Sequence, residues 1–364
     1  MSRRLLNPDR LRRVAQGAVR PPQGEPTTLP EEGLRISASP HIKAPDSTAR
    51  IMWSVVLSLM PVVAVSTWLF GAAALLVIAA ATLGALLTER AFGPGGTLRD
   101  GSAAITGLLL GLTLPAGMPL WMAFLGGAFG IGFGKLIFGG LGQNIFNPAL
   151  LGRAFLQAAF PTAITTWPAL EGGWLAARGD SFALPLMGAG GIDAVTSATP
   201  LGLMKFEGEA TEALGLFLGT TGGSLGETST LLILLGGAYL AAKRYLDWRI
   251  PVGIFATVAA LSLLVQAIDP TKPGPLFMLF SGGLALGAVY MATDMVTSPV
   301  TRGGAWVYAV GIGALVVLIR LWGGLPEGVM YAILFMNAFV PFIDRATRPR
   351  VFGTSRRRDR KAAA

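Results

Sequence analysis

The sequence predicts an all-α membrane protein with about ten transmembrane helices, arranged as two inverted repeats of five helices, some of them broken or half-length. Three observations predict this fold class. Hydrophobic residues make up 52% of the 364 residues and charged residues only 13%, whereas soluble domains carry about 25% charged residues. The mean hydropathy is +0.59, and the apolar residues fall into ten separate segments. The 49 glycines permit close packing of helices in a bilayer.

The ten apolar segments form two groups of five, separated by a polar loop. They lie at about 51–70, 71–88, 103–114, 119–138 and 147–160, and then at about 230–243, 250–268, 275–292, 304–322 and 328–343. A full crossing needs roughly 20 residues. The third and fifth segments are shorter, which is typical of discontinuous helices that line a site.

Weak internal similarity relates the two groups. The Gly-Leu-Leu-Leu-Gly of 107–111 resembles the Gly-Leu-Ala-Leu-Gly of 283–287, and Gly-Gly-Leu recurs at 139–141 and 323–325. Such short matches also arise by chance, but an odd number of crossings per group makes the repeat an inverted one. The expected organisation is a cytoplasmic arm (1–48), a first repeat (49–160), a loop (161–229), a second repeat (230–343) and a basic tail (344–364).

Charge predicts the orientation. The net charge is +9, and basic residues gather in both tails and at Lys243, Arg244 and Arg249, which marks these parts as cytoplasmic. The 161–229 loop holds seven Asp/Glu and two Lys/Arg, so it is expected in the periplasm. Arg320, near the outer end of the ninth segment, is expected to snorkel. Because the basic residues flank apolar segments, membrane anchoring explains them better than nucleic-acid binding.

The rarity of cysteine and histidine restricts the chemistry. The chain has no cysteine and one histidine. This excludes thiolate metal sites and iron–sulfur clusters held by the chain itself, and we expect no metal site. The arginine- and proline-rich N-terminus shows no cleavable signal peptide.

The outer loop contains the string Asp-Ala-Val-Thr-Ser-Ala-Thr-Pro at 193–200. Small polar residues before a proline are ordinary loop chemistry. The string also resembles the Asp-x-x-Ser/Thr-Gly/Ser-Ala-Thr motif at which a flavin transferase links FMN through its phosphate to the final threonine. In this chain that threonine is Thr199. Asp193, Thr196 and Ser197 occupy the other motif positions, and the resemblance gives Asp193 a part in recognition by the transferase.

A second string, Gly-Gly-Leu-Gly-Gln-Asn-Ile-Phe-Asn-Pro-Ala at 139–149, precedes the fifth segment. Asn147 is expected to cap a helix that has Pro148 at its first position. Asn144 and Asn147 are expected on one face of that helix, beside free backbone N–H groups. Polar side chains at a membrane-embedded helix start are costly unless they bind something, and amides suit the edge of an isoalloxazine ring. We expect leucine at both positions to preserve the fold.

A third string at 291–299 includes Asp294. It is either a solvated turn after a helix or a break that lines a site. Asp294 is also one of four acids near the ends of apolar segments, the others being Asp100, Glu227 and Asp344. Each of the four is either an interfacial charge or a candidate for ion coupling.

These strings, with Ser-Pro-His-Ile at 39–42 and Thr-Arg-Pro-Arg at 347–350, closely resemble one family from about residue 37 to 353. The family comprises the D subunits of Rnf electron-transport complexes and the related B subunits of sodium-pumping NADH:quinone oxidoreductases, and the two outer strings favour the Rnf members. Met295 departs from the proline usual in the family.

The resemblance implies a function. It implies covalent FMN on the outer loop and a non-covalent riboflavin deeper in the membrane, contacted at Asn144 and Asn147. It also implies that Asp100, Glu227 and Asp344 match positions implicated in ion coupling. Electrons would pass between ferredoxin and NAD through partner subunits, coupled to sodium or proton movement.

The expected protein is therefore a flavin-carrying subunit of an ion-translocating ferredoxin:NAD oxidoreductase in a bacterial inner membrane, with both termini cytoplasmic. It would be matured by a flavin transferase, would assemble with iron–sulfur and flavin subunits, and would not act as an enzyme alone. Two alternatives remain open. One is an inverted-repeat channel or secondary transporter without a redox cofactor, and the other is a purely structural assembly subunit.

Overall fold

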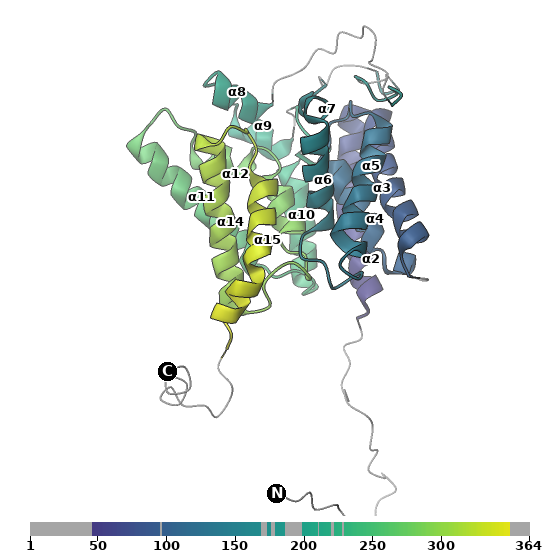
Figure 1. Cartoon of the computed structure of the whole chain (residues 1–364). Coiled ribbons are helices and arrows are strands. Elements are labelled where there is room, and N and C mark those ends of the chain that lie inside the picture. Colours follow the sequence, from purple (N-terminus) through teal and green to yellow (C-terminus); the bar gives the residue numbers. More distant parts are fainter. Residues whose placement is uncertain are drawn as a thin grey trace, which may run out of the picture. The chain divides into compact units, whose positions relative to one another are not determined.

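The computed structural model describes residues 46–94, 97–168, 173–175, 179–185, 199–209, 211–219, 222–227 and 229–349. The described part from Asp46 onward forms one unit by its internal contacts. Its regular secondary structure is helical, with no strand among these residues (Figure 1). This confirms the predicted all-α class.

The first group of apolar segments forms helices close to the expected bounds. They are α2 (Thr48–Phe70), α3 (Ala72–Phe92), α4 (Ser102–Leu112), α5 (Leu120–Ile131) with its π-helical continuation η2 (Gly132–Leu136), and α6 (Pro148–Ala159). A short 3₁₀ turn, η1 (Thr97–Asp100), precedes α4. Helices α4 and α6 are short, as the sequence predicts, and are not interrupted.

The second group forms a matching series. It comprises α10 (Thr230–Ala242), α11 (Arg249–Ile268), α12 (Pro275–Phe280), α13 (Leu284–Leu286) with its π-helical continuation η4 (Gly287–Met291), α14 (Arg302–Trp322) and α15 (Val329–Ala346). The described parts of the intervening loop contribute α7 (Pro161–Thr165), α8 (Pro200–Phe206), α9 (Ala213–Leu218) and a 3₁₀ turn, η3 (Leu225–Glu227). Five of the described helices are apolar and long enough to cross a membrane: α2, α3, α11, α14 and α15. The chain is therefore a membrane protein.

Close packing around α3 depends on glycines of its neighbours. In the first group α3 packs against α4 and α5, and in the second α11 packs against α14. A Cβ added at Gly107 of α4 would lie 2.3 Å from the Thr82 Cα, and one at Gly127 of α5 would lie 2.0 Å from the Ala81 carbonyl oxygen. Helix backbones approach this closely only where a side chain is missing.

The eighth apolar segment is broken between α12 and α13, which the sequence analysis did not predict. Gly282 adopts a left-handed conformation there, with φ of 64°. The buried Arg320 of α14 donates from Nη1 to the Met278 carbonyl at 2.6 Å and from Nη2 to the Ser281 carbonyl at 2.9 Å. Carbonyls at a helix end need such donors. The expectation that Arg320 snorkels is therefore wrong, because its guanidinium points inward to satisfy the break.

The two groups of helices contact each other through α2 with α10 and through α6 with α15. In Figure 1 helix α6 runs toward α7, and α8 and α9 lie near that same end of the helices. The start of α6 lies at the opposite end. Helix α6 therefore runs from one end of the described helices toward the end at which α7, α8 and α9 lie.

Candidate functional site

Two cavities lie at successive levels of α6. The inner cavity, of ≈ 90 Å³, is lined at the start of α6 by Asn147, Pro148 and Ala149. The outer cavity, of ≈ 490 Å³, is lined further along α6 by Arg153 and Gln157. Asn147 and Arg153 are six positions apart, which is roughly 9 Å along a helix axis. One helix thus contributes to both cavities.

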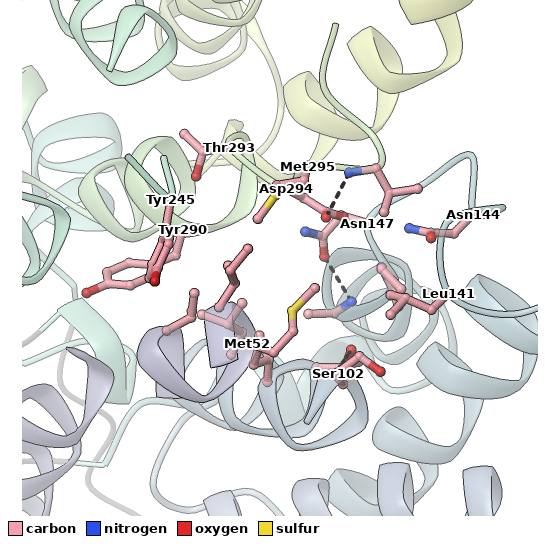
Figure 2. A pocket seen from close by; sticks show the side chains of 18 of the residues that line it. Met52, Ser102, Leu141, Asn144, Asn147, Tyr245, Tyr290, Thr293, Asp294 and Met295 are labelled. Carbon is pink, nitrogen blue, oxygen red and sulfur yellow. Dashed lines mark hydrogen bonds between the residues drawn. The ribbon is translucent and has the colours of Figure 1, made fainter. Parts of the chain in front are cut away.

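Asn147 caps α6, as the sequence predicts (Figure 2). Its Oδ1 accepts from the backbone N–H of Ala149 at 3.0 Å and of Leu150 at 3.3 Å. Its Nδ2 donates to the Met291 carbonyl at 3.2 Å, at the end of η4 in the second group of helices. Because Asn147 satisfies two N–H groups itself, those groups are not free to attract a ligand, contrary to expectation.

Asn144 lies in an irregular segment before α6, so the two asparagines do not share a helix face as expected. Its Nδ2 donates to the Phe146 carbonyl at 3.4 Å, a long bond. Both asparagines nevertheless line the inner cavity, where Asn144 lies at its edge in Figure 2. Helix α6 begins at Pro148, with Asn147 as its cap. Asn144 therefore lies three residues before the cap and outside the helix.

The third string of the sequence borders the same inner cavity. Asp294 lines it together with Thr293 and Met295 (Figure 2). The Asp294 carboxylate accepts from the Val296 N–H at 3.3 Å and from the Thr297 hydroxyl at 3.2 Å. The structure therefore brings Asn144, Asn147 and Asp294 together, although Asp294 follows them by about 150 residues in the sequence.

A buried ion pair missed by the sequence analysis adjoins the inner cavity. Lys135 of η2 lines the cavity and donates from Nζ to Glu89 Oε1 of α3 and to the Ser102 hydroxyl, both at 2.6 Å. Asp100 Oδ2 lies 3.9 Å from the same Nζ. Lys135 lies inside the predicted segment 119–138, and Glu89 directly follows the predicted segment 71–88. Ionisable residues inside or at the edge of apolar segments are the signal that would have found the pair.

A polar contact between α14 and α15 also binds the backbone of Asn147. With its side-chain amide oriented to satisfy its neighbours, Asn337 Oδ1 accepts from the Asn147 backbone N–H at 3.2 Å, and its Nδ2 donates to Tyr308 Oη at 2.6 Å. Asn337 and Tyr308 are both buried. Polar residues of two apolar helices therefore hold the start of α6.

Thr199 lies on the wall of the outer cavity. Its Oγ1 accepts from the Gly202 N–H at 3.1 Å and so caps α8. The cavity is also lined by Trp167, Glu227 and Tyr331. The other three residues of the predicted motif, Asp193, Thr196 and Ser197, lie outside the described residues.

A second ion pair missed by the sequence analysis lines the outer cavity. Arg153 Nη2 donates to Glu327 Oε2 at 2.5 Å, and Glu327 Oε1 accepts from the Gly283 N–H at 2.8 Å. The Arg153 side chain is 8% exposed and that of Glu327 18%. The pair joins α6 to the segment before α15 and to the break in the eighth segment. Partners so far apart in the sequence leave no local pattern.

Lys205 of α8 binds the end of α14 and so holds the Thr199 segment, residues 199–206, against it. Its Nζ donates to the carbonyls of Gly323 at 2.6 Å and Leu325 at 2.8 Å, with further carbonyls of α14 within reach. Burial lowers the pKa of the Lys205 ammonium. A cation on the last carbonyls of a helix is favourable, so Lys205 holds the Thr199 segment beside the outer cavity.

The four candidate coupling acids divide into two kinds. Glu227 lines the outer cavity and Asp294 the inner one. Asp100 Oδ1 instead accepts from the Ser102 N–H at 2.8 Å, and Asp344 Oδ1 accepts from the Val300 N–H at 3.1 Å. The last two carboxylates hold backbone near the starts of α4 and α14, and neither lines the inner or the outer cavity.

Comparison with known proteins places this geometry in a family. The chain is 46% identical over 335 residues to the D subunit of the ion-translocating oxidoreductase complex of Stutzerimonas stutzeri, covering 85% of this chain and 94% of that protein. It is 45% identical over 336 residues to the D subunit of the proton-translocating ferredoxin:NAD(+) oxidoreductase complex of Clostridium ljungdahlii, covering 88% and 96%.

The D subunit of the Na(+)-translocating ferredoxin:NAD(+) oxidoreductase complex of Acetobacterium woodii is 40% identical over 334 residues, covering 90% of this chain and 97% of that protein. Residues 35–353 match the model of one protein family, a range that contains both cavities and all the helices described above. The chain belongs to the NQR2, RnfD, RnfE family.

Proposed function

We propose that this chain is the D-type membrane subunit of an ion-translocating ferredoxin:NAD(+) oxidoreductase complex in a bacterial inner membrane, and that it carries FMN on Thr199 and riboflavin in the inner cavity. The names of the relatives support the kind of complex. They imply partner subunits, for which we expect iron–sulfur and flavin proteins, and movement of protons or sodium ions. A flavin transferase would attach the FMN.

The proposed arrangement has ten crossings in two inverted repeats. Its support is the matched packing of the two groups: α3 with α5 corresponds to α11 with α14, and α5 with α6 corresponds to α14 with α15. The positive-inside rule then puts both termini in the cytoplasm and the 161–229 loop in the periplasm. In this arrangement the chain divides into the arm (1–48), the first repeat (49–160), the loop (161–229), the second repeat (230–343) and the tail (344–364).

The observation that carries the FMN proposal is the Thr199 hydroxyl on the wall of the outer cavity. The cavity volume of ≈ 490 Å³ lies in the range of roughly 300–1,000 Å³ usual for ligand sites. Trp167 and Tyr331 offer ring surfaces, and Arg153, which is paired with Glu327, contributes its guanidinium to the same wall. The residues therefore fit FMN. A bound flavin would supply electron transfer between partner subunits, while the chain positions and shields it.

The inner cavity fits riboflavin by its chemistry more than by its present size. Its wall is mostly apolar, with the Asn144 amide, the Asp294 carboxylate and Lys135 as polar groups, a composition typical of cofactor sites. At ≈ 90 Å³ it is narrow for a tricyclic ring. The flexible side chains of Met52 and Met295 on its wall would move to admit one.

The test is flavin fluorescence of the denatured chain after electrophoresis. Thr199→Ala should abolish covalent flavin, and Thr199→Ser should retain some of it because it keeps a hydroxyl. Thr199→Asn is the matched control for folding, since asparagine also caps a helix but has no hydroxyl, and it should be dark. Thr196→Ala should remain fluorescent. A fluorescent Thr199→Asn chain refutes the assignment, and a dark wild-type chain favours a transporter without redox cofactor.

A further inference from the structure

We propose that Lys135 places a fixed positive charge on the wall of the inner cavity and thereby sets the electron affinity of the redox group bound there, with Glu89 and Asp100 opposing it. The inference rests on the proposed function, because it needs a flavin in that cavity. Lys135 acts as a positioning charge and takes no part in covalent chemistry.

The ion pair is built into a buried, unusual piece of backbone. The side chain of Lys135 is 3% exposed and that of Glu89 0%. Lys135 belongs to the π-helical segment η2, in which the Ile137 N–H donates to the Gly132 carbonyl five residues back, at 3.1 Å. Segments of this kind often occur at functional sites, because the extra residue re-aims a side chain.

The charges are arranged in order of distance from the cavity. Lys135 and Ser102 are among its lining residues, while Glu89 and Asp100 lie behind them. Glu89 Oε2 is buried and has no hydrogen-bond partner among the described residues. The Lys135 ammonium is thus the charge nearest to any bound group. The carboxylates of Glu89 and Asp100 are further from the cavity, on the other side of Lys135.

A stabilising role alone does not account for this cluster. Burial of a carboxylate and an ammonium costs several kcal/mol per ion, and well-packed apolar residues are often as stable as a buried ion pair. The unpartnered Glu89 Oε2 increases that cost. Charges kept inside a membrane segment in spite of this cost usually act on something nearby. The low dielectric lets the field of Lys135 reach across the cavity.

The sign of each effect follows from electrostatics. A flavin that takes up an electron gains negative charge, which Lys135 stabilises and Glu89 destabilises. Removal of the lysine charge should therefore lower the midpoint potential of the inner flavin. Removal of the Glu89 charge should raise it. A purely structural pair predicts no such opposition, since either change would disturb the same packing.

The experiment is a redox titration, followed by visible absorbance, of the non-covalent flavin in the purified whole complex. Glu89→Gln should raise the ratio of reduced to oxidised flavin at a fixed applied potential by roughly tenfold, the effect of one charge about 10 Å away at an effective dielectric of about 20. Lys135→Met should lower it by a larger factor, because Lys135 lies on the cavity wall and is the nearer charge. Lys135→Arg keeps the charge and should stay close to wild type.

Because Lys135→Met leaves Glu89 buried without a partner and so threatens folding, a double variant is included. Lys135→Gln with Glu89→Gln retains a side-chain hydrogen bond without either charge, and because the nearer charge dominates, its potential should also fall. If the midpoint potentials of Glu89→Gln and of the double variant shift in the same direction, or if neither shifts, this inference is overturned. The assignment of a flavin to the inner cavity would still stand. A wild-type complex without non-covalent flavin overturns the inner-site assignment and this inference together.

Discussion

Replacement of Asn147 by leucine should destabilise the protein, contrary to the expectation from the sequence that leucine would be tolerated. The change removes the cap of α6, whose loss costs about 1 kcal/mol. It also leaves the buried Met291 carbonyl without the Nδ2 donor, which costs roughly 1–3 kcal/mol. The sum is about 2–4 kcal/mol, which corresponds to a fall in thermal midpoint of roughly 3–5 °C for a chain of this size.

Asn144→Leu is the matched control. Its hydrogen bond to the Phe146 carbonyl is long, at 3.4 Å, and its side chain also hydrogen-bonds the Asp294 carboxylate, which keeps the Val296 N–H and the Thr297 hydroxyl as donors. Removal of Asn144 should therefore cost less than removal of Asn147, about 1 kcal/mol. Asn147→Ser should fall between the two, since serine keeps a capping oxygen. The assay is heating of the purified, detergent-solubilised complex followed by size-exclusion chromatography. Equal midpoints for Asn147→Leu and wild type would refute the argument that this side chain holds α6.

The same variants then separate the fold from the site. Asn144→Leu leaves the cap of α6 intact and removes one of the polar groups on the wall of the inner cavity. We expect its non-covalent riboflavin content to fall while the Thr199-linked FMN stays constant and the thermal midpoint stays near that of wild type. Unchanged riboflavin in Asn144→Leu would show that this asparagine does not contact the flavin.

Three further predictions follow from orientation and contacts. A reporter fused near Gly190 should be active only outside the cytoplasm and one at the C-terminus only inside, which reporter enzymes specific to each side would check. Lys205→Met removes the ammonium that binds carbonyls at the end of α14, so the fluorescence anisotropy of the attached FMN should fall relative to Lys205→Arg. Arg153→Met and Glu327→Met should each lower the free energy of unfolding by about 2–4 kcal/mol because each leaves a largely buried charge unpaired. In a double-mutant cycle measured by thermal unfolding, the double variant should be destabilised by less than the sum of the two single variants. Additive effects would contradict a direct ion pair.

Helix positions could be predicted from the sequence because apolar length is a local property. The expected segment at 250–268 corresponds to α11, Arg249–Ile268, and that at 304–322 corresponds to α14, Arg302–Trp322. The break at Gly282 was missed because two short apolar helices in succession have the same composition as one long helix. Its stabilising residue, Arg320, lies 38 positions later in the sequence, where no periodicity reveals it.

The candidate sites were predictable in part for the same reason. The strings around Asn147 and Asp294 were identified separately, and Asn147 was correctly expected to be a cap, since capping depends on neighbouring residues. The partnership of Arg153 with Glu327 spans 174 positions and needs the tertiary structure. Lys135 could have been identified from the sequence, because a charged residue inside the predicted segment 119–138 needs an explanation, and Glu89 directly follows the predicted segment 71–88.

Helix α6 determines how the two cavities are related. It belongs to the first group of helices, yet its start and its middle are bonded to the second group. At its start Asn147 donates to the Met291 carbonyl, and two turns later Arg153 pairs with Glu327. The backbone hydrogen bonds of α6 keep the helix rigid between these two residues, so a shift of α6 would displace the walls of both cavities together. The roughly 9 Å between the two residues therefore stays constant, whereas the fit of each cavity depends on how the second group of helices packs against α6.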